Sequence, residues 1–133
     1  MIIGIGNDKI DIRRIEETLK KYGERFLNRV FTETERQKAA SRHTPAPTLA
    51  KRFAAKEACA KALGTGIAQG VHWRDIGVVN LPGGKPSIDL VGGGATRLAG
   101  MVPAGHKPVI HVTLTDDYPY AEAHVIIEAV PEA

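Results

Sequence analysis

The chain lacks the residues that mark several common protein classes. It contains a single cysteine, Cys59, so no disulfide forms within one chain and nothing requires an oxidising compartment. No run of residues approaches the roughly 20 apolar positions of a membrane-spanning helix. The apolar stretch at the N-terminus is too short for a signal peptide and has no basic segment before it. We therefore expect a cytoplasmic protein that has no membrane association.

Aromatic side chains are also scarce. Phe, Tyr and Trp make up 5% of the chain and do not interleave with the basic clusters. Modules that bind single-stranded nucleic acid use aromatic faces beside basic groups, so the sequence disfavours that class. The net charge of +3 fits an anionic ligand or an acidic partner, although the charge alone would also fit nucleic acid.

What is present is the composition of a globular domain. Hydrophobic residues make up 43% of the 133 residues and charged residues 25%. A chain of this length buries about two-thirds of the surface that its unfolded form exposes, so it builds a core without disulfides or structural metal. We expect one domain that spans residues 1–133.

Helical patterns dominate the first half of the chain. Apolar residues at helical spacing predict a helix from Ile12 to Tyr22, closed by Gly23. The capping box at 32–35 predicts the start of a second helix. An alanine-rich helix is expected from about Pro47 to Leu63, where glycines end it.

Strand patterns fill most of the rest. The final strand alternates so that Ala121, Ala123, Val125 and Ile127 share an inner face. Helices in the first half and antiparallel strands in the second predict an α+β fold, with helices packed on a mainly antiparallel sheet that the N-terminal strand joins. The predicted strands are Ile2–Ile5, 75–80, 87–91, 108–115 and 121–128, with a short helix at 94–101.

Two segments carry candidate chemistry. Asp8 follows the predicted end of the N-terminal strand, where a carboxylate can either hold a metal ion or cap the next helix. In the alanine-rich helix, Glu57 and Lys61 are four residues apart and share a face, but such a pair is also an ordinary feature of a solvated surface. Taken singly, neither segment identifies a function.

Together these segments resemble the bacterial holo-acyl-carrier-protein synthases, a branch of the 4′-phosphopantetheinyl transferases. The resemblance covers nearly the whole chain, although many members carry Ser-His where this chain has Thr115-Asp116. The matching segments are Gly4-Ile5-Gly6-Asn7-Asp8 with Ile12-Arg13-Arg14-Ile15, Arg52-Phe53-Ala54-Ala55-Lys56-Glu57-Ala58 with Lys61 and Gly64-Thr65-Gly66, Gly84-Lys85-Pro86, His111-Val112-Thr113-Leu114, and Val125–Glu128.

The resemblance implies an enzyme that moves 4′-phosphopantetheine from coenzyme A to a serine of an acidic apo-acyl-carrier protein. The products are the holo-carrier and adenosine 3′,5′-bisphosphate, and the reaction supports fatty acid biosynthesis. The resemblance also implies a homotrimer with sites between subunits, and the inner face of the final strand is a candidate for packing at the three-fold axis.

The resemblance assigns roles to individual residues. Asp8 and Glu57 would bind Mg²⁺ and, with Lys61, form the catalytic group, in which either Glu57 or a water on the metal accepts the serine proton. Phosphoryl-type transfer needs positioning and charge neutralisation, which Mg²⁺ and lysine provide. The coenzyme A contacts would be Arg52, Lys61, Gly64, Thr65, Pro86, His111 and Thr113, and the carrier contacts Arg14, Arg13, Lys21 and Arg25.

Three other readings remain open from the sequence. A different magnesium-dependent phosphate enzyme, such as a nucleotide hydrolase, would share the carboxylates and the lysine but would need no acidic partner. A small nucleic-acid-binding module would need more aromatic residues. A structural trimer without chemistry would leave Asp8, Glu57 and Lys61 unexplained.

Overall fold

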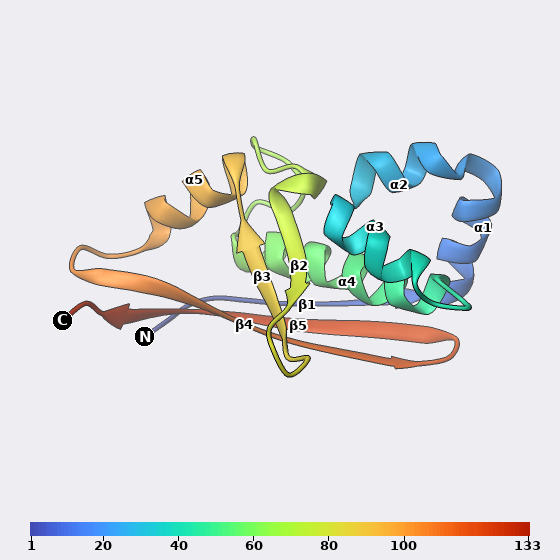
Figure 1. The fold of residues 1–133 in the computed structure, drawn as a ribbon. Coiled ribbons are helices and arrows are strands. Elements are labelled where there is room, and N and C mark those ends of the chain that lie inside the picture. The colour runs from blue at the N-terminus through green and yellow to red at the C-terminus, as the bar shows by residue number, and fades with distance from the viewer.

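A three-stranded antiparallel sheet forms one layer of the molecule. In the computed structural model, which describes residues 1–133, β1 (Ile2–Asp11), β5 (Tyr120–Pro131) and β4 (His106–Asp117) lie in the order β1-β5-β4. The helices lie over one side of this long sheet, and the two termini meet at one end of it (Figure 1). The α+β prediction is confirmed, as is the place of the N-terminal strand in the main sheet.

The first strand is longer than the sequence predicted. Pairing with β5 continues through Asp8, which lies opposite Ala123, and ends where Asp11 lies opposite Tyr120. The prediction that the strand stops before Asp8 is therefore wrong, because glycine and polar residues extend when a long partner strand pairs with them. Asp11 caps the following helix, accepting a hydrogen bond of 3.0 Å from the Arg13 backbone N–H.

One alanine-rich helix, α4 (Ala46–Ala62), covers the inner face of the sheet. Small side chains let the helix approach closely, and its alanines at 50, 54, 55, 58 and 60 are completely buried. The predicted inner face of β5, which consists of Ala121, Ala123, Val125 and Ile127, is at most 1% exposed and lies in the same core. That face is confirmed, but α4 already covers it, so it cannot also pack at a three-fold axis.

Shorter helices flank α4 on the N-terminal side. The predicted helix is α1 (Ile12–Tyr22), and the capping box of Thr32 and Glu35 begins α3 (Glu33–Ala40) as expected. Between them lies α2 (Glu24–Val30), which the sequence did not predict. Gly23 separates α1 from α2 with a φ of +51°, so one glycine serves as the end of one helix and the start of the next.

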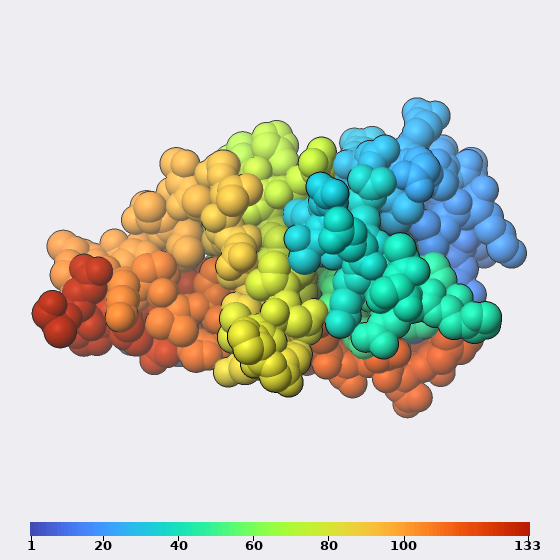
Figure 2. Space-filling view, in the orientation of Figure 1, coloured from blue at the N-terminus to red at the C-terminus, as the bar shows by residue number.

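The predicted strands at 75–80 and 87–91 pair as a hairpin and form a second, separate sheet. Its strands are β2 (Ile76–Asn80) and β3 (Pro86–Leu90), and a single 3₁₀ turn, η1 (Trp73–Asp75), precedes them. The turn between the strands stands out between the N-terminal helices and the C-terminal strands (Figure 2). After β3 comes α5 (Gly92–Met101). None of the helices combines the length and the hydrophobicity that a membrane span requires.

A buried ion pair ties these layers together. Glu35 of α3 and Lys56 of α4 have no exposed surface, and Lys56 Nζ lies 2.8 Å from Glu35 Oε1. The lysine also donates to the carbonyls of Trp73 and Ile76, and Glu35 Oε2 accepts from the Val78 N–H at 2.7 Å. Burial lowers the pKa of Lys56, while the charge of Glu35 favours its protonated form.

Candidate active site

Two glycines bring β1 directly against α4. A Cβ at Gly6 would lie 2.0 Å from the Ala58 carbonyl oxygen, and one at Gly4 would lie 2.3 Å from that of Ala62. Alternate strand residues are about 6.6 Å apart and helix residues four apart are about 6 Å apart, so these glycines match two successive helical turns. Only glycine allows this approach. The contact carries the rest of β1, including Asp8, along the surface of α4.

The close approach joins Asp8 to Lys61. Lys61 Nζ donates to Asp8 Oδ1 and to the Asn7 carbonyl oxygen, each at 3.0 Å. The side chain of Asp8 is 18% exposed and that of Lys61 is 51% exposed, so the pair opens to solvent on the lysine side. The sequence paired Lys61 with Glu57 on one helix. The ion pair that forms is instead with a residue more than fifty positions away.

Glu57 lies in the same electrostatic environment. Burial raises the pKa of the Glu57 carboxyl, and the neighbouring Asp8 carboxylate raises it further, while Lys61 and Arg14 act in the opposite direction. Two nearby carboxylates repel each other when both are ionised, and a divalent cation between them relieves that repulsion. The arrangement therefore favours a bound cation.

The donor set fits Mg²⁺ in particular. No group of three or more His, Cys, Asp or Glu side chains is arranged as a complete cage for a metal ion. Mg²⁺ does not need one, because it is commonly held by one or two carboxylates together with substrate phosphates and water. Asp8 and Glu57 are the two carboxylates that would hold the ion, and Lys61 lies beside Asp8.

A second group of cations lines a pocket at the start of α4. This basic pocket, with a volume of about 530 Å³, lies where the approach to α4, the β2–β3 turn and β4 meet. The first turn of α4, at Pro47 and Thr48, also lines the pocket. The N-terminal end of a helix carries a partial positive charge, which adds to the positive potential of the pocket. The charged residues of the basic pocket are Lys38, Arg42, Lys51, Arg52 and Asp116.

Arg52 is the buried member of the basic pocket. It is 4% exposed, and Nη2 donates to Asn80 Oδ1 at 3.0 Å, while Nε has no hydrogen-bond partner. Burial lowers the pKa of Arg52, with Arg42 adding to that effect. A guanidinium buried among other cations gains from an anionic ligand, so the charges of the pocket suit an anionic group such as a phosphate. The sequence identified Arg52 and Pro86 here but not Lys38, Arg42 or Lys51.

The predicted His111 and Thr113 lie elsewhere. Together with Pro86 they line a hollow of about 480 Å³ on the side of the main sheet that faces away from α4. His111 Nε2 lies 3.0 Å from Glu128 Oε1, and half of its side chain is exposed. None of Asp8, Glu57 and Lys61 lines this hollow or the basic pocket. One chain therefore holds the predicted site residues in separate groups.

The Gly64-Thr65-Gly66 segment closes α4 at the Lys61 end. The backbone N–H groups of Thr65 and Gly66 both donate to the Ala60 carbonyl, and the Thr65 hydroxyl donates to the Gly66 carbonyl at 2.8 Å. Gly64 has a φ of +81°. The predicted helix end is confirmed, and these residues lie one turn beyond Lys61.

The predicted carrier contacts, in α1 and α2, differ in whether their charges are already paired within the chain. Arg14 is exposed and forms no ion pair, whereas Arg13 is held by Asp11 in a contact of 2.6 Å. Lys21 lies over the ring of Tyr22, with Nζ 5.3 Å from the ring centroid. Arg25 lines a pocket of about 450 Å³ between α1, α2 and η1.

Aromatic rings form the floor of this last pocket, the aromatic pocket, which the sequence did not predict. Phe26, Phe53 and Trp73 line it, and the Phe53 and Trp73 ring centroids are 4.8 Å apart. Phe53 lies one helical turn before Glu57 on α4. The aromatic pocket is therefore next to Asp8 and Glu57, which we call the acidic pair. No local sequence pattern indicates this cluster, because its three members are far apart in the sequence.

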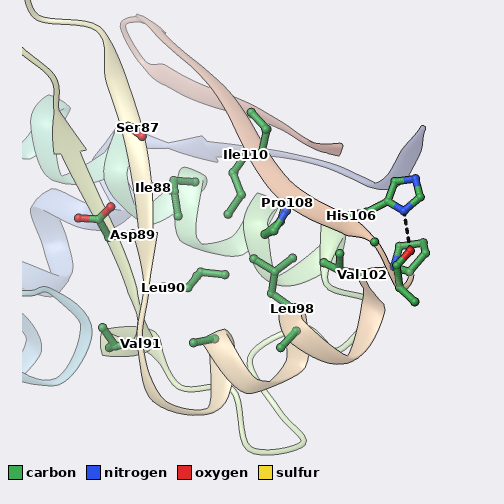
Figure 3. Close-up of a pocket in the computed structure, with 16 residues that line it drawn as sticks. Ser87, Ile88, Asp89, Leu90, Val91, Leu98, Val102, His106, Pro108 and Ile110 are labelled. Atoms are coloured by element: carbon green, nitrogen blue, oxygen red, sulfur yellow. Dashed lines mark hydrogen bonds between the residues drawn. The ribbon is translucent and has the colours of Figure 1, made fainter. Parts of the chain in front are cut away.

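The largest hollow has a different character. It measures about 960 Å³ and lies between β3, α5 and β4. Ile88, Leu90, Leu98 and Ile110 point into it, while Asp89 points away (Figure 3). It has no cation to hold a phosphate, so its size alone does not make it the site for this chemistry.

Comparison with known proteins gives a consistent picture. The sequence profile of the 4′-phosphopantetheinyl transferase superfamily matches residues 4–121. The holo-[acyl-carrier-protein] synthase of Chelativorans sp. (strain BNC1) is 67% identical over 130 residues, which is 98% of each chain. The enzyme of the same name from Rhizobium meliloti (strain 1021) is 64% identical over 133 residues, covering all of this chain and 96% of the other.

Solved structures agree with the sequence relatives. The holo-[acyl-carrier-protein] synthase of Neisseria meningitidis is similar with a TM-score of 0.84 and 36% identity, covering 96% of this chain and 99% of that chain. The synthase of Bacillus anthracis str. Ames, solved in complex with CoA (3′,5′-ADP), gives a TM-score of 0.77 at 36% identity, covering 98% and 99%.

Proposed function

The chain belongs to the 4′-phosphopantetheinyl transferase superfamily, and on that premise we propose that it transfers 4′-phosphopantetheine from coenzyme A to a serine of an acidic apo-acyl-carrier protein. The products are the holo-carrier and adenosine 3′,5′-bisphosphate. Residues 1–133 act as one transferase domain in the cytoplasm, and the holo-carrier serves fatty acid biosynthesis. The observation that carries the proposal is the Asp8–Lys61 pair beside Glu57, held together by the glycine contact of β1 with α4.

Each of these three side chains has a proposed role. Asp8 and Glu57 hold Mg²⁺, which when bound neutralises charge on the pyrophosphate of coenzyme A. Glu57, or a water on the metal, would accept the serine proton. Lys61 is one helical turn further on and neutralises the leaving phosphate. Family membership disfavours the hydrolase, nucleic-acid and structural readings of the sequence.

The remaining phosphate of coenzyme A needs a second cationic site. The pyrophosphate belongs beside Asp8, Glu57 and Lys61, so the 3′-phosphate of the nucleotide is left for the basic pocket that contains Arg52. A phosphate monoester gains most from several cations and helix N–H groups together. Gly64 and Thr65 contact the donor near Lys61, and Pro86, His111 and Thr113 contact it from the outer face of the sheet.

The separation of these groups supports sites that lie between subunits. The outer face of the main sheet has no helix over it (Figure 1), and it carries Ile5, which is 71% exposed and pairs across the sheet with Ile126. An open sheet face with apolar residues favours association. We assign the contacts of the homotrimer to this outer face, and its active sites to the boundaries between subunits.

We predict that sedimentation finds a particle of three times the 14.3 kDa chain mass. Ile5→Asp should shift the mass towards one chain, because it buries a carboxylate in the proposed contact while the interior of the subunit is unchanged. Circular dichroism of the variant checks that the subunit stays folded. A wild-type monomer at micromolar concentration would contradict the trimer without touching the assignment of the chemistry.

The carrier-binding surface combines charge with the aromatic pocket. Arg14 lies close enough to affect the pKa of Glu57 and has no competing ion pair, so it is free to meet an acid near the serine. Arg25 contributes charge at the rim of the aromatic pocket, whose floor fits an apolar side chain of the carrier. Arg13 and Lys21 complete the basic surface of α1.

Reversing the charge of Arg14 should weaken binding of the carrier protein and leave binding of coenzyme A unchanged. For Arg14→Glu we expect the KM for the carrier to rise roughly 10-fold or more, because electrostatic steering of an acidic partner is lost. The KM for coenzyme A should change little, and the salt dependence of carrier turnover should flatten. Steady-state kinetics with each substrate varied at several ionic strengths provide the measurement.

The matched control is Lys20→Glu, which makes the same charge reversal on another face of α1. It should change the carrier KM by less than about threefold if the effect is local. A rise in the coenzyme A KM alone for Arg14→Glu would place α1 at the nucleotide site and overturn the docking surface.

A mass measurement tests the function itself. The enzyme is incubated with coenzyme A, Mg²⁺ and an apo-acyl-carrier protein, and the mass of the carrier is determined. We expect the carrier to gain one phosphopantetheine on its serine and adenosine 3′,5′-bisphosphate to accumulate in equal amount. Hydrolysis of coenzyme A with an unmodified carrier would refute the proposal.

A further inference from the structure

One acidic side chain lies among the cations of the basic pocket. Asp116, near the end of β4, forms an ion pair with Lys51 of α4, with Lys51 Nζ 3.1 Å from Asp116 Oδ1. Both line the pocket together with Lys38, Arg42 and Arg52. The side chains are 27% and 37% exposed, so the pair is partly screened from water. Asp116 is also a position at which this chain departs from the pattern of the family that it resembles.

This carboxylate acts against an anionic ligand in two ways. It occupies the ammonium group of Lys51, so a phosphate must compete for that cation. Its own charge also repels the phosphate across a pocket that is smaller than the Debye length of ~10 Å at 0.1 M salt, which means that ions in solution screen the repulsion poorly. A pocket with four cations and no acid would bind a phosphate more tightly than this one.

Tight binding at this end of the nucleotide is not an advantage for turnover. Coenzyme A and adenosine 3′,5′-bisphosphate share the same 3′-phosphate, so a pocket that recognises the donor also retains the product. Release of product limits the rate of many enzymes. A residue that loosens the pocket therefore favours the next cycle, at the expense of some affinity for the donor.

We propose that Asp116, by holding Lys51, weakens the grip of the basic pocket on the nucleotide 3′-phosphate and speeds the release of adenosine 3′,5′-bisphosphate. The inference rests on the proposed function. Asp116 is a positioning residue that acts on the basic pocket through Lys51 and through its own charge, so its removal should affect only ligands that carry the 3′-phosphate. It should not affect the chemistry beside Glu57.

The test compares the wild type with Asp116→Asn, which removes the charge and keeps the shape. Calorimetry should show that the variant binds adenosine 3′,5′-bisphosphate roughly 3- to 10-fold more tightly, the range expected when one nearby charge is removed at a partly exposed site. Stopped-flow displacement should show that the product dissociates more slowly by a similar factor. Adenosine 5′-monophosphate, which lacks the 3′-phosphate, should bind both proteins equally.

Two further variants make the result specific. Asp117→Asn removes the neighbouring exposed carboxylate, which has no ion pair, and should leave the affinity for the bisphosphate within about 1.5-fold of the wild type. In a Lys51→Met background, Asp116→Asn should give a smaller gain in affinity than in the wild type, because the competition for Lys51 is gone. If Asp116→Asn fails to fold in a thermal melt, Asp116→Ser replaces it.

The outcomes separate the two claims. Equal or weaker binding of the bisphosphate by Asp116→Asn, or an equal gain in Asp117→Asn, would overturn the role of Asp116 and leave the transferase function standing. Failure of the wild type to bind the bisphosphate at all would count against the proposed function. A tighter complex with both bisphosphate and monophosphate would show that Asp116 faces another part of the nucleotide, which also overturns the inference.

Discussion

The Glu57→Gln enzyme is expected to transfer phosphopantetheine roughly 10²–10³-fold more slowly than the wild type, the usual cost of removing one electrostatic contributor at a reacting centre. If Glu57 is also the base, the loss grows by a factor of up to ~10⁴. Asp8→Asn should fall in the lower range, because Asp8 is proposed to hold the metal and takes no proton. Initial rates with a saturating carrier, measured across a range of Mg²⁺ concentrations, provide the comparison.

The fold should survive both changes. Glutamine and asparagine keep the size of the side chains, and both positions are partly exposed, so urea melts should differ from the wild type by less than about 1 kcal/mol. Glu132→Gln, which alters an exposed carboxylate near the C-terminus that lines none of the described pockets, serves as the activity control. Rates within a few-fold of wild type for both Glu57→Gln and Asp8→Asn would end the assignment of this acidic pair.

The Lys56→Met variant is expected to lose stability rather than chemistry, although Lys56 is the neighbour of Glu57. The change leaves the completely buried Glu35 without its cation and removes the donor to the Trp73 and Ile76 carbonyls. Breaking a buried pair from one side typically costs about 3–5 kcal/mol. Urea denaturation followed by circular dichroism measures the loss.

A second substitution tests the cause of that loss. In Lys56→Met/Glu35→Gln the buried charge is gone, so part of the stability should return, while Glu35→Gln alone leaves Lys56 uncompensated. Lys107→Met, which removes an exposed lysine without an ion pair, should stay within about 0.5 kcal/mol of the wild type. A loss below 1 kcal/mol for Lys56→Met would mean that water or other polar groups replace the pair.

Much of the local structure followed from the sequence. The helix from Ile12 to Tyr22, the capping box of Thr32 with Glu35 and the inner face of β5 agree with the structure. Each of these depends on side chains a few residues apart, whose spacing is fixed by the 3.6-residue or two-residue period of the backbone. The α2 helix was not predicted, although Phe26, Leu27 and Val30 recur at helical spacing, because the helix has only seven residues and Gly23 indicates the end of a helix rather than a start.

The site was only partly predictable. Its three central residues were found from a resemblance over nearly the whole chain, since Asp8 alone could have been a helix cap and Glu57 with Lys61 an ordinary helical pair. The aromatic pocket and the acid in the basic pocket left no local signal. Phe26, Phe53 and Trp73 come from three separate elements, and Lys51 meets Asp116 from the other half of the chain.

By itself the sequence determined the elements, the fold class and the residues able to do the chemistry. Tertiary structure alone decided which of those residues meet. Asp8 faces Lys61 because β5 extends β1 past its apolar run and because Gly4 and Gly6 let that strand lie against the carbonyls of α4. Packing also covered the inner face of β5 and left the outer face open. Periodicity is a property of neighbours along the chain, whereas these contacts arise from close packing between elements that the sequence keeps far apart.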